Sequence, residues 1–324
     1  MTLSEEIRAL LVKAEEGDPE AQFEVANAFF YGKGAELNPE EGQKWGQKAA
    51  ENGHVLAQFE LGHALVREAT REFVEIFPRY LNNFGKGLHR PHIAPIFIPL
   101  DPLSDDDIKA AKMLDAKARK HIINSMIPHP KYQRAHKTLW EGIHWLEESA
   151  EQDYGPAQYE LGELYQTNCP FPLDGKKSIK YLELAIEKGH AVAMRILARI
   201  YYIGIMGVVQ PNKAKCAALL KEAARLGDPV SQNDLGMMLF HGDGVEEDKE
   251  EAVLLWENAV SKDFHCAIQN LSVCLYLGNG VEMDRERAIA LCRKIADHSA
   301  TAAKILEKML AGSNELCISD ITLQ

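Results

Sequence analysis

The chain has 324 residues, of which 46% are apolar, so it can bury a substantial hydrophobic core. Its 36 basic and 48 acidic side chains give a net charge of −12, which disfavours non-specific binding to nucleic acid or to anionic membrane surfaces. No run of about 18 apolar residues occurs, so no transmembrane helix is predicted, and the acidic start is unlike a secretory signal peptide.

Residues 1–16 are predicted to form a single helix that caps the rest of the chain. The segment matches the second half of a pattern that is first complete in residues 17–52. In that pattern a small residue, Ala21, is followed four residues later by an apolar residue and another small one. These positions fall on one face of a helix, so they predict the buried face of a first helix.

A second helix is predicted in the same unit. Gly32 and Gly34 can adopt the positive φ angles that end one helix and direct the next, and Asn38 with Glu41 forms a capping signal for the second helix. The second helices carry a bulky residue that we expect in the core. These bulky residues are Trp45, Trp145, Tyr181, Leu219, Leu255 and Leu291.

The pattern recurs along the whole chain, and we number repeat positions from its aligned small residue. The aligned residues are Ala21, Ala57, Ala157, Ala193, Ser231, Ala267 and Ala302. A period of this length indicates stacked units that depend on their neighbours for a core. The units are expected near 17–52, 53–152, 153–188, 189–226, 227–262 and 263–310, with a tail at 311–324.

The unit at 53–152 contains an insertion at about 67–137. Its first part is predicted to extend a helix until Pro78, and Thr138 to Glu141 is predicted to restart the repeat with a capping box. Between them we expect an extended Pro-rich segment, 89–103, and a helix from Ser104. The insertion is basic, whereas the remainder is acidic. It either docks on its own repeats or contributes to partner binding.

The consensus AxxxLGxxY…GxGVxxD…KAxxW…AAxxG, seen at 157–165 and 242–248, resembles the Sel1-like repeat, a relative of the tetratricopeptide repeat. The resemblance implies an all-α fold, a right-handed α/α solenoid of helix pairs. It also implies an adaptor or scaffold without catalytic activity. Asp153 and Asp263 depart from the pattern, because they stand where other units have a boundary glycine.

No catalytic constellation, cofactor site or phosphate-binding loop is predicted, because the glycine pairs lie between helices. Six histidines between His89 and His144 suggest a metal site or, alternatively, ordinary hydrogen-bonded side chains. The six cysteines occupy different repeat positions, which indicates reduced thiols and a cytoplasmic location rather than a disulfide framework.

The expected function is protein–protein interaction through the concave face, which first helices line in solenoids of this kind. Variable residues at position +6 and aromatic residues at position +9 are the candidates for binding a protein or peptide. The candidates are Asn27, Phe30, His63, Glu163, Arg199, Tyr202, Met237, Phe240 and Tyr276. Alternatively, the rings close the core of their own repeats. The glutamines at position +1 are expected to form hydrogen bonds between helices.

Two functions are compatible with the sequence. The first is a scaffold or adaptor for a protein partner. The second is an immunity or inhibitor protein that binds and neutralises one toxin or enzyme, for which an acidic surface and a private insertion would be suited. The sequence identifies neither the partner nor the oligomeric state.

Overall fold

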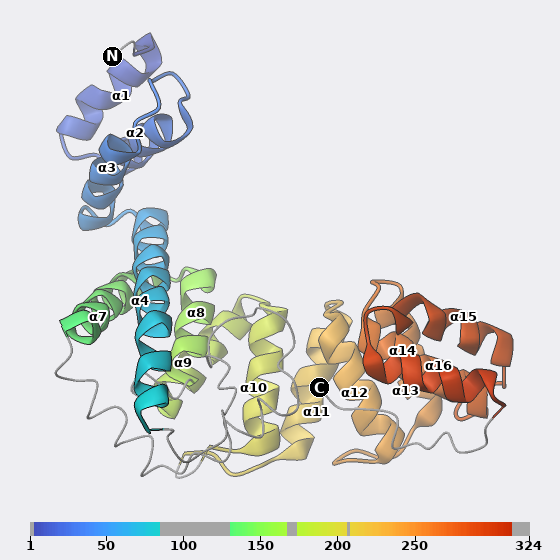
Figure 1. Cartoon of the computed structure of the whole chain (residues 1–324). Coiled ribbons are helices and arrows are strands. Elements are labelled where there is room, and N and C mark those ends of the chain that lie inside the picture. The colour runs from blue at the N-terminus through green and yellow to red at the C-terminus, as the bar shows by residue number, and fades with distance from the viewer. Residues whose placement is uncertain (1–2, 85–129, 167–173, 206–207, 313–324) are drawn as a thin grey trace. The chain divides into compact units, whose positions relative to one another are not determined.

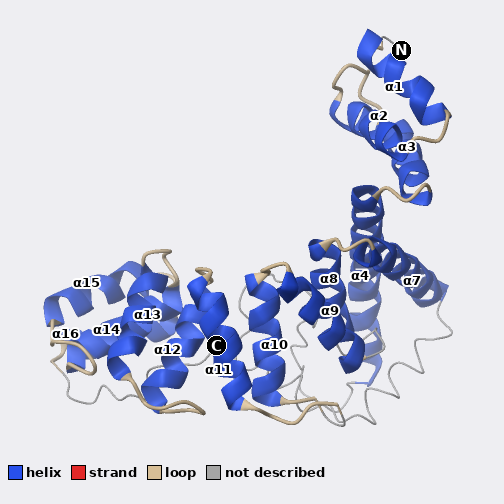
Figure 2. Cartoon of the chain, turned by 180° about the vertical axis from the view of Figure 1, so that it is seen from behind, coloured by secondary structure: helices blue, strands red, loops and turns tan. Residues whose placement is uncertain are grey.

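The computed structural model describes residues 3–84, 130–166, 174–205 and 208–312 (Figures 1 and 2). The described residues are predominantly helical, and their one β-bridge pairs Ile205 with Val209. The predicted all-α class is therefore confirmed. The chain divides into two compact units, Met1–Tyr181 and Leu182–Gln324.

The first unit consists of a capping helix followed by helix pairs. Its helices are α1 (Glu5–Glu15), α2 (Pro19–Tyr31), α3 (Pro39–Glu51), α4 (Val55–Phe84), α7 (Pro130–Glu151), α8 (Gly155–Gln166) and the start of α9 (Gly175–Glu187). The second unit continues the same alternation. Its helices are α10 (Ala191–Ile203), α11 (Lys213–Arg225), α12 (Pro229–His241), α13 (Lys249–Val260), α14 (His265–Leu277), α15 (Arg285–Ala296) and α16 (Ala300–Leu310).

Capping residues set the helix starts as predicted. The Asn38 side chain accepts a hydrogen bond from the Glu41 backbone N–H at 3.2 Å, and Asp248 does the same for Glu251 at 2.9 Å. Each bond satisfies one of the N–H groups that have no partner within the helix. Asp153 and Asp263 adopt positive φ angles of 67° and 56°, so aspartate occupies the glycine conformation at these two boundaries.

Glutamines at position +1 connect four of the first helices to the preceding helix, as expected. In four repeats the side-chain Nε2 donates to the backbone oxygen of an alanine eight residues earlier. The pairs are Gln22 with Ala14 (2.8 Å), Gln58 with Ala50 (3.1 Å), Gln158 with Ala150 (3.2 Å) and Gln232 with Ala224 (3.1 Å). These alanines lie near helix C-termini, where carbonyl groups lack intrahelical partners.

In the second helices the predicted bulky position shares the core with the residue that follows it. Trp45, Tyr181 and Leu291 are buried, whereas Trp145, Leu219 and Leu255 are partly buried. The next residue along is buried in several repeats. Examples are Leu146, Leu182, Leu220, Trp256 and Cys292. Trp145 packs against the core cluster of Ala49, Ala50 and Ala57 but stays partly buried, so its predicted core position is met only in part, while the next residue, Leu146, is fully buried.

Both helices that flank the insertion are longer than predicted. α4 continues through Pro78 to Phe84, and α7 begins at Pro130 and passes through Thr138 without a break, so both predicted boundaries are wrong. A proline inside a helix removes one hydrogen bond but need not end the helix when other contacts hold it. Tyr132 packs edge-on against Phe73, with ring centroids 5.4 Å apart, and so joins α7 to α4 ahead of the repeat.

Glycines allow α4 and α7 to approach closely (Figure 1). A Cβ atom on Gly62 would lie 2.8 Å from the Gly142 backbone oxygen, and one on Gly142 would lie 2.9 Å from the Gly62 oxygen. Both distances are too short for a methyl group, so glycine is required at this crossing. The Pro-rich segment 89–103 and the helix expected from Ser104 lie outside the described residues.

Candidate functional site

The predicted candidates of the first unit lie at least partly at the surface. Phe30 is 39% exposed, and Asn27, His63 and Glu163 are partly buried. His63 and Glu163 come from successive first helices, α4 and α8. Both residues lie near Glu160, which was not among the residues predicted from the sequence.

The candidates of the second unit fall into two groups. Arg199 is exposed and Tyr202 is partly buried. Met237, Phe240 and Tyr276 are each only 2% exposed and belong to the core of the unit. Direct contact between a partner and these three side chains would require the core to open.

Three of the four aromatic residues at position +9 have a cation of their own repeat over the ring. In three repeats the first residue of the second helix is basic, and its charged group lies over the ring. The pairs are Lys213 over Tyr202 (5.3 Å), Lys249 over Phe240 (5.6 Å) and Arg285 over Tyr276 (4.9 Å). Such cation–π contacts give these rings a structural role, which is the alternative that the sequence left open. In the first repeat Pro39 replaces the cation, and Phe30 remains exposed.

A different position, +3, carries carboxylates on the first helices of both units. These position +3 carboxylates are Glu24, Glu60, Glu160 and Asp234. Glu24 and Glu60 are exposed, whereas Glu160 and Asp234 are partly buried. The sequence already contained this signal, because the residues follow the aligned small residue by three places. The predicted contact residues lie at positions +6 and +9 and therefore do not include it.

Glu160 lies against His63 on the surface of the first unit. The Nδ1 atom of His63 is 2.9 Å from Oε1 and 2.8 Å from Oε2 of Glu160. Burial raises the pKa of the Glu160 carboxyl above its ordinary value, and the contact with His63 opposes this only in part. Glu163 adds a second negative charge nearby, and Arg67 a positive one.

Aromatic rings at position +2 lie beside the carboxylates in the first unit. The Phe59 ring stacks on His63 at 5.8 Å and meets Tyr154 edge-on at 5.2 Å. In the preceding repeat Phe23 stacks on His54 at 4.3 Å. Phe59 and Tyr154 are only partly buried, so aromatic surface is accessible next to Glu160.

Asp234 is the counterpart of Glu160 in the second unit. Burial raises the pKa of Asp234 to about 6, against the hydrogen bond that Asn233 Nδ2 donates at 3.1 Å and the positive charges of Arg195 and Arg199. The Asn233 Oδ1 atom in turn accepts from Asn270 Nδ2 at 3.0 Å. A polar network therefore crosses from α12 to α14 at this point.

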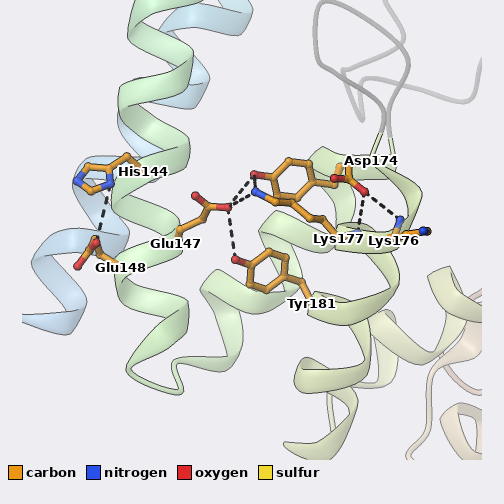
Figure 3. A network of polar contacts seen from close by, with 8 residues as sticks. His144, Glu147, Glu148, Asp174, Lys176, Lys177 and Tyr181 are labelled. Atoms are coloured by element: carbon orange, nitrogen blue, oxygen red, sulfur yellow. Dashed lines mark hydrogen bonds and ion pairs between the residues drawn. The ribbon is translucent and has the colours of Figure 1, made fainter.

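A polar network centred on Glu147 joins side chains of the first unit (Figure 3). Glu147 Oε1 accepts from the Tyr165 hydroxyl at 2.8 Å, from Lys177 Nζ at 2.9 Å and from the Tyr181 hydroxyl at 3.4 Å. Burial acts to raise the pKa of Glu147, but the hydrogen bonds from Lys177 and Tyr165 outweigh it, so the pKa is lowered. The network ties α7, α8 and α9 together, and its satisfied groups indicate a structural role.

Features of other kinds of site are absent from the described residues. In that part of the chain no three His, Cys, Asp or Glu side chains are grouped as metal ligands would be. None of its helices combines the length and apolar character needed to cross a membrane. Burial raises the pKa values of the Cys216 and Cys266 thiols to about 11, which disfavours the reactive thiolate form.

Comparison with known proteins places these features in a family. The family model described as Sel1 repeat matches more than half of the chain, at residues 19–54, 141–154, 155–190, 191–228, 229–264 and 267–299. The chitin synthase regulator SKT5 of Saccharomyces cerevisiae is 22% identical over 273 residues, which cover 79% of this chain but only 39% of that protein.

Solved structures with low sequence identity share the fold. A Sel1 repeat protein from Oxalobacter formigenes has a TM-score of 0.54 at 20% identity, with 90% of this chain and 89% of that chain covered. The protective antigen c5321 from uropathogenic Escherichia coli has a TM-score of 0.49 at 20% identity, with 97% and 69% covered. At this level of identity the first similarity supports the solenoid fold alone.

Proposed function

The chain belongs to the Sel1 repeat family, and from that premise we propose that it is a non-catalytic scaffold that binds a protein partner through its first helices. Sel1 repeats generally mediate protein–protein interaction, and no feature of the described residues points to an enzymatic activity. In the first unit the proposed contact residues are Glu24, Asn27, Phe30, Glu60, His63, Glu160 and Glu163. In the second unit they are Arg199 and Asp234.

One observation carries this proposal. Glu160 and Asp234 occupy the same repeat position, and burial raises the pKa of both carboxyls. A raised pKa means that the fold disfavours the ionised form of each group. Carboxyls with perturbed pKa values are enriched at functional sites. A cationic partner would offset the cost of ionising these two partly buried groups.

The cytoplasm is the compartment that we propose for this interaction. The cysteines occupy different repeat positions, as expected for reduced thiols rather than for a repeated disulfide. The net charge of −12 supports a protein partner rather than nucleic acid or an anionic membrane surface.

Affinity purification from the native cell, followed by mass spectrometry, tests the proposal. The wild-type chain is used as bait and is compared with a variant in which four carboxylates are changed to the corresponding amides. They are Glu24, Glu60, Glu160 and Asp234. A matched control changes exposed carboxylates of second helices, Glu40, Glu51, Glu141 and Glu250. We expect partners that the control retains and the variant loses. Identical partner sets for both variants would contradict the assigned surface, and one tight partner would favour an inhibitor protein.

A further inference from the structure

We infer that the C-terminal end of α2 binds a basic side chain of the protein partner, which lies over the ring of Phe30. This inference rests on the proposed function and names the chemistry of the partner at one place in the first unit. The place consists of the exposed side chains Phe30, Tyr31 and Leu37 and the exposed carboxylates Glu36 and Glu40, which we call the Phe30 surface.

The other repeats show what an aromatic ring at position +9 binds. In three of them the residue that begins the second helix is basic, and its charged group lies over the ring at 4.9 to 5.6 Å from the centroid. Two of these residues are lysines and one is an arginine, so the positive charge is what they share. In the first repeat α3 begins with Pro39, and the nearby Lys33 lies over Tyr31 instead, at 5.8 Å. Phe30 therefore lacks the contact that its counterparts have.

The ring of Phe30 is held in place by α3. A Cβ atom on Gly42 would lie 3.0 Å from the Cγ atom and 3.1 Å from the Cδ2 atom of Phe30, so the ring packs directly on the helix backbone at this glycine. The side chain is nevertheless exposed. A ring that is already fixed in the free protein loses little conformational freedom when a partner binds, which favours binding.

Carboxylates near the ring favour a cation as its ligand. In the second unit, Lys249 pairs with Glu247 of the segment before its helix, at 2.8 Å, while it lies over the ring of its own repeat. The corresponding segment of the first repeat contains Glu36, and Glu40 lies in the first turn of α3. A basic group on Phe30 would be stabilised by these charges, whereas an acidic or phosphorylated segment would be repelled.

Exposed apolar side chains extend the surface beyond the ring. Tyr31 is 69% exposed and Leu37 is 62% exposed. A Cβ atom on Gly32 would lie 3.7 Å from the Cβ atom of Leu37, so Leu37 lies against the end of α2, where Tyr31 is the last residue. Adjacent exposed apolar side chains are typical of protein contact sites. We therefore expect an apolar residue beside the basic residue of the partner.

A peptide of this chemistry provides the test. A fluorescein-labelled peptide in which leucine–lysine pairs are separated by glycine and serine is titrated with the full chain, and fluorescence anisotropy is recorded. A second peptide carries acetyl-lysine, which is neutral, in place of lysine. We expect the acetylated peptide to bind at least about fivefold more weakly than the lysine peptide. Phe30→Ala is expected to weaken the lysine peptide about tenfold.

Substitution of Pro39 tests the comparison between repeats. Pro39→Lys puts a lysine where the second unit has Lys213 and Lys249, so it should cover Phe30 and weaken the lysine peptide at least about fivefold. Pro39→Ala adds no charge, and Gln47→Lys adds the same charge elsewhere on α3. Both controls are expected to change the affinity by less than about twofold. Circular dichroism verifies that each variant is folded.

Four results would overturn the inference. The first two are failure of the lysine peptide to bind, and equal binding of the two peptides, which would show an apolar contact without a cation. The third is equal weakening by Pro39→Lys and Gln47→Lys. The fourth is a wild-type dimer in sedimentation that Phe30→Ala dissociates, which would assign the surface to a second copy of the chain.

Each of these results leaves the proposed scaffold function standing, because that function is judged by the partners that the chain captures. Failure of the wild-type chain to capture a partner from the native cell would instead count against the proposed function.

Discussion

Glu160 of α8 and Asp234 of α12 occupy the same position of their repeats, and burial raises the pKa of both carboxyl groups. The two residues belong to different compact units of the chain. Glu24 and Glu60 occupy the same position but are exposed, so burial of a carboxylate there depends on what the neighbouring helices place beside it.

Asp234→Asn is expected to stabilise the chain at neutral pH. The pKa of Asp234 in the folded state, about 6, lies above its ordinary value of 3.8. The stabilising contribution of protonated Asp234 to the free energy of unfolding is therefore present at low pH and is lost as pH rises through about 6. The variant avoids this loss, so near pH 7 we expect it to be more stable by about 2 kcal/mol.

Urea unfolding of both chains from about pH 4 to about pH 7 measures the effect. The difference in unfolding free energy between variant and wild type should grow with pH across this window. Asp248→Asn serves as the control, because Asp248 is exposed and asparagine keeps a side-chain oxygen that can accept the N-cap hydrogen bond from Glu251. A difference that is constant with pH would show that Asp234 ionises normally.

Trp256→Ala is expected to destabilise the chain by about 3–5 kcal/mol, because a large fully buried side chain is removed. Trp256 is 0% exposed, and its Nε1 atom donates to the Asn233 backbone oxygen at 3.2 Å. Trp140 is 38% exposed, so Trp140→Ala should cost much less. Equal shifts of the denaturant midpoint for the two variants would refute the assignment of Trp256 to the core.

Gly142→Ala is expected to destabilise the chain by about 1–3 kcal/mol, because the added methyl group would clash with the backbone of α4. Gly46→Ala is the control, since a Cβ atom there meets only the Ala26 Cβ atom, at 3.9 Å. In the interior of a helix that second change should stabilise by about 0.5–1 kcal/mol. If the melting temperatures of both variants shifted in the same direction from that of the wild type, the result would contradict the close approach of α4 and α7.

Asp263→Gly is expected to stabilise the chain by about 0.5–1 kcal/mol, because glycine adopts a φ of 56° without the strain that a Cβ atom brings. Gly189 occupies the same repeat position with a φ of 76°, and a Cβ atom added there would meet no other atom within 4 Å. Gly189→Ala should therefore destabilise through backbone strain alone, by about 1 kcal/mol. Calorimetric melting curves that shift in the same direction for both changes would rule out this explanation.

The sequence predicted the helix pairs, their caps and the glutamine contacts because these depend on short-range spacing. It failed at Pro78 and Thr138, which lie inside α4 and α7, because a proline or a capping signal in the local sequence does not by itself decide where a helix ends. For the candidate surface, it identified His63, which is partly exposed, but it also gave Met237, which is buried, and it left open whether Phe240 and Tyr276 bind a partner or close the core. Their burial depends on packing across the whole unit, which helical periodicity in one segment does not describe.

The proposed role of the first helices is tested most directly by calorimetric titration of a captured partner into three chains. They are the wild type, the variant with amides at Glu24, Glu60, Glu160 and Asp234, and the matched variant of second-helix carboxylates. We expect the first variant to bind at least about tenfold more weakly and the matched variant to bind like the wild type. Equal affinity of all three chains would show that the partner binds elsewhere and would contradict the proposed role of the first helices.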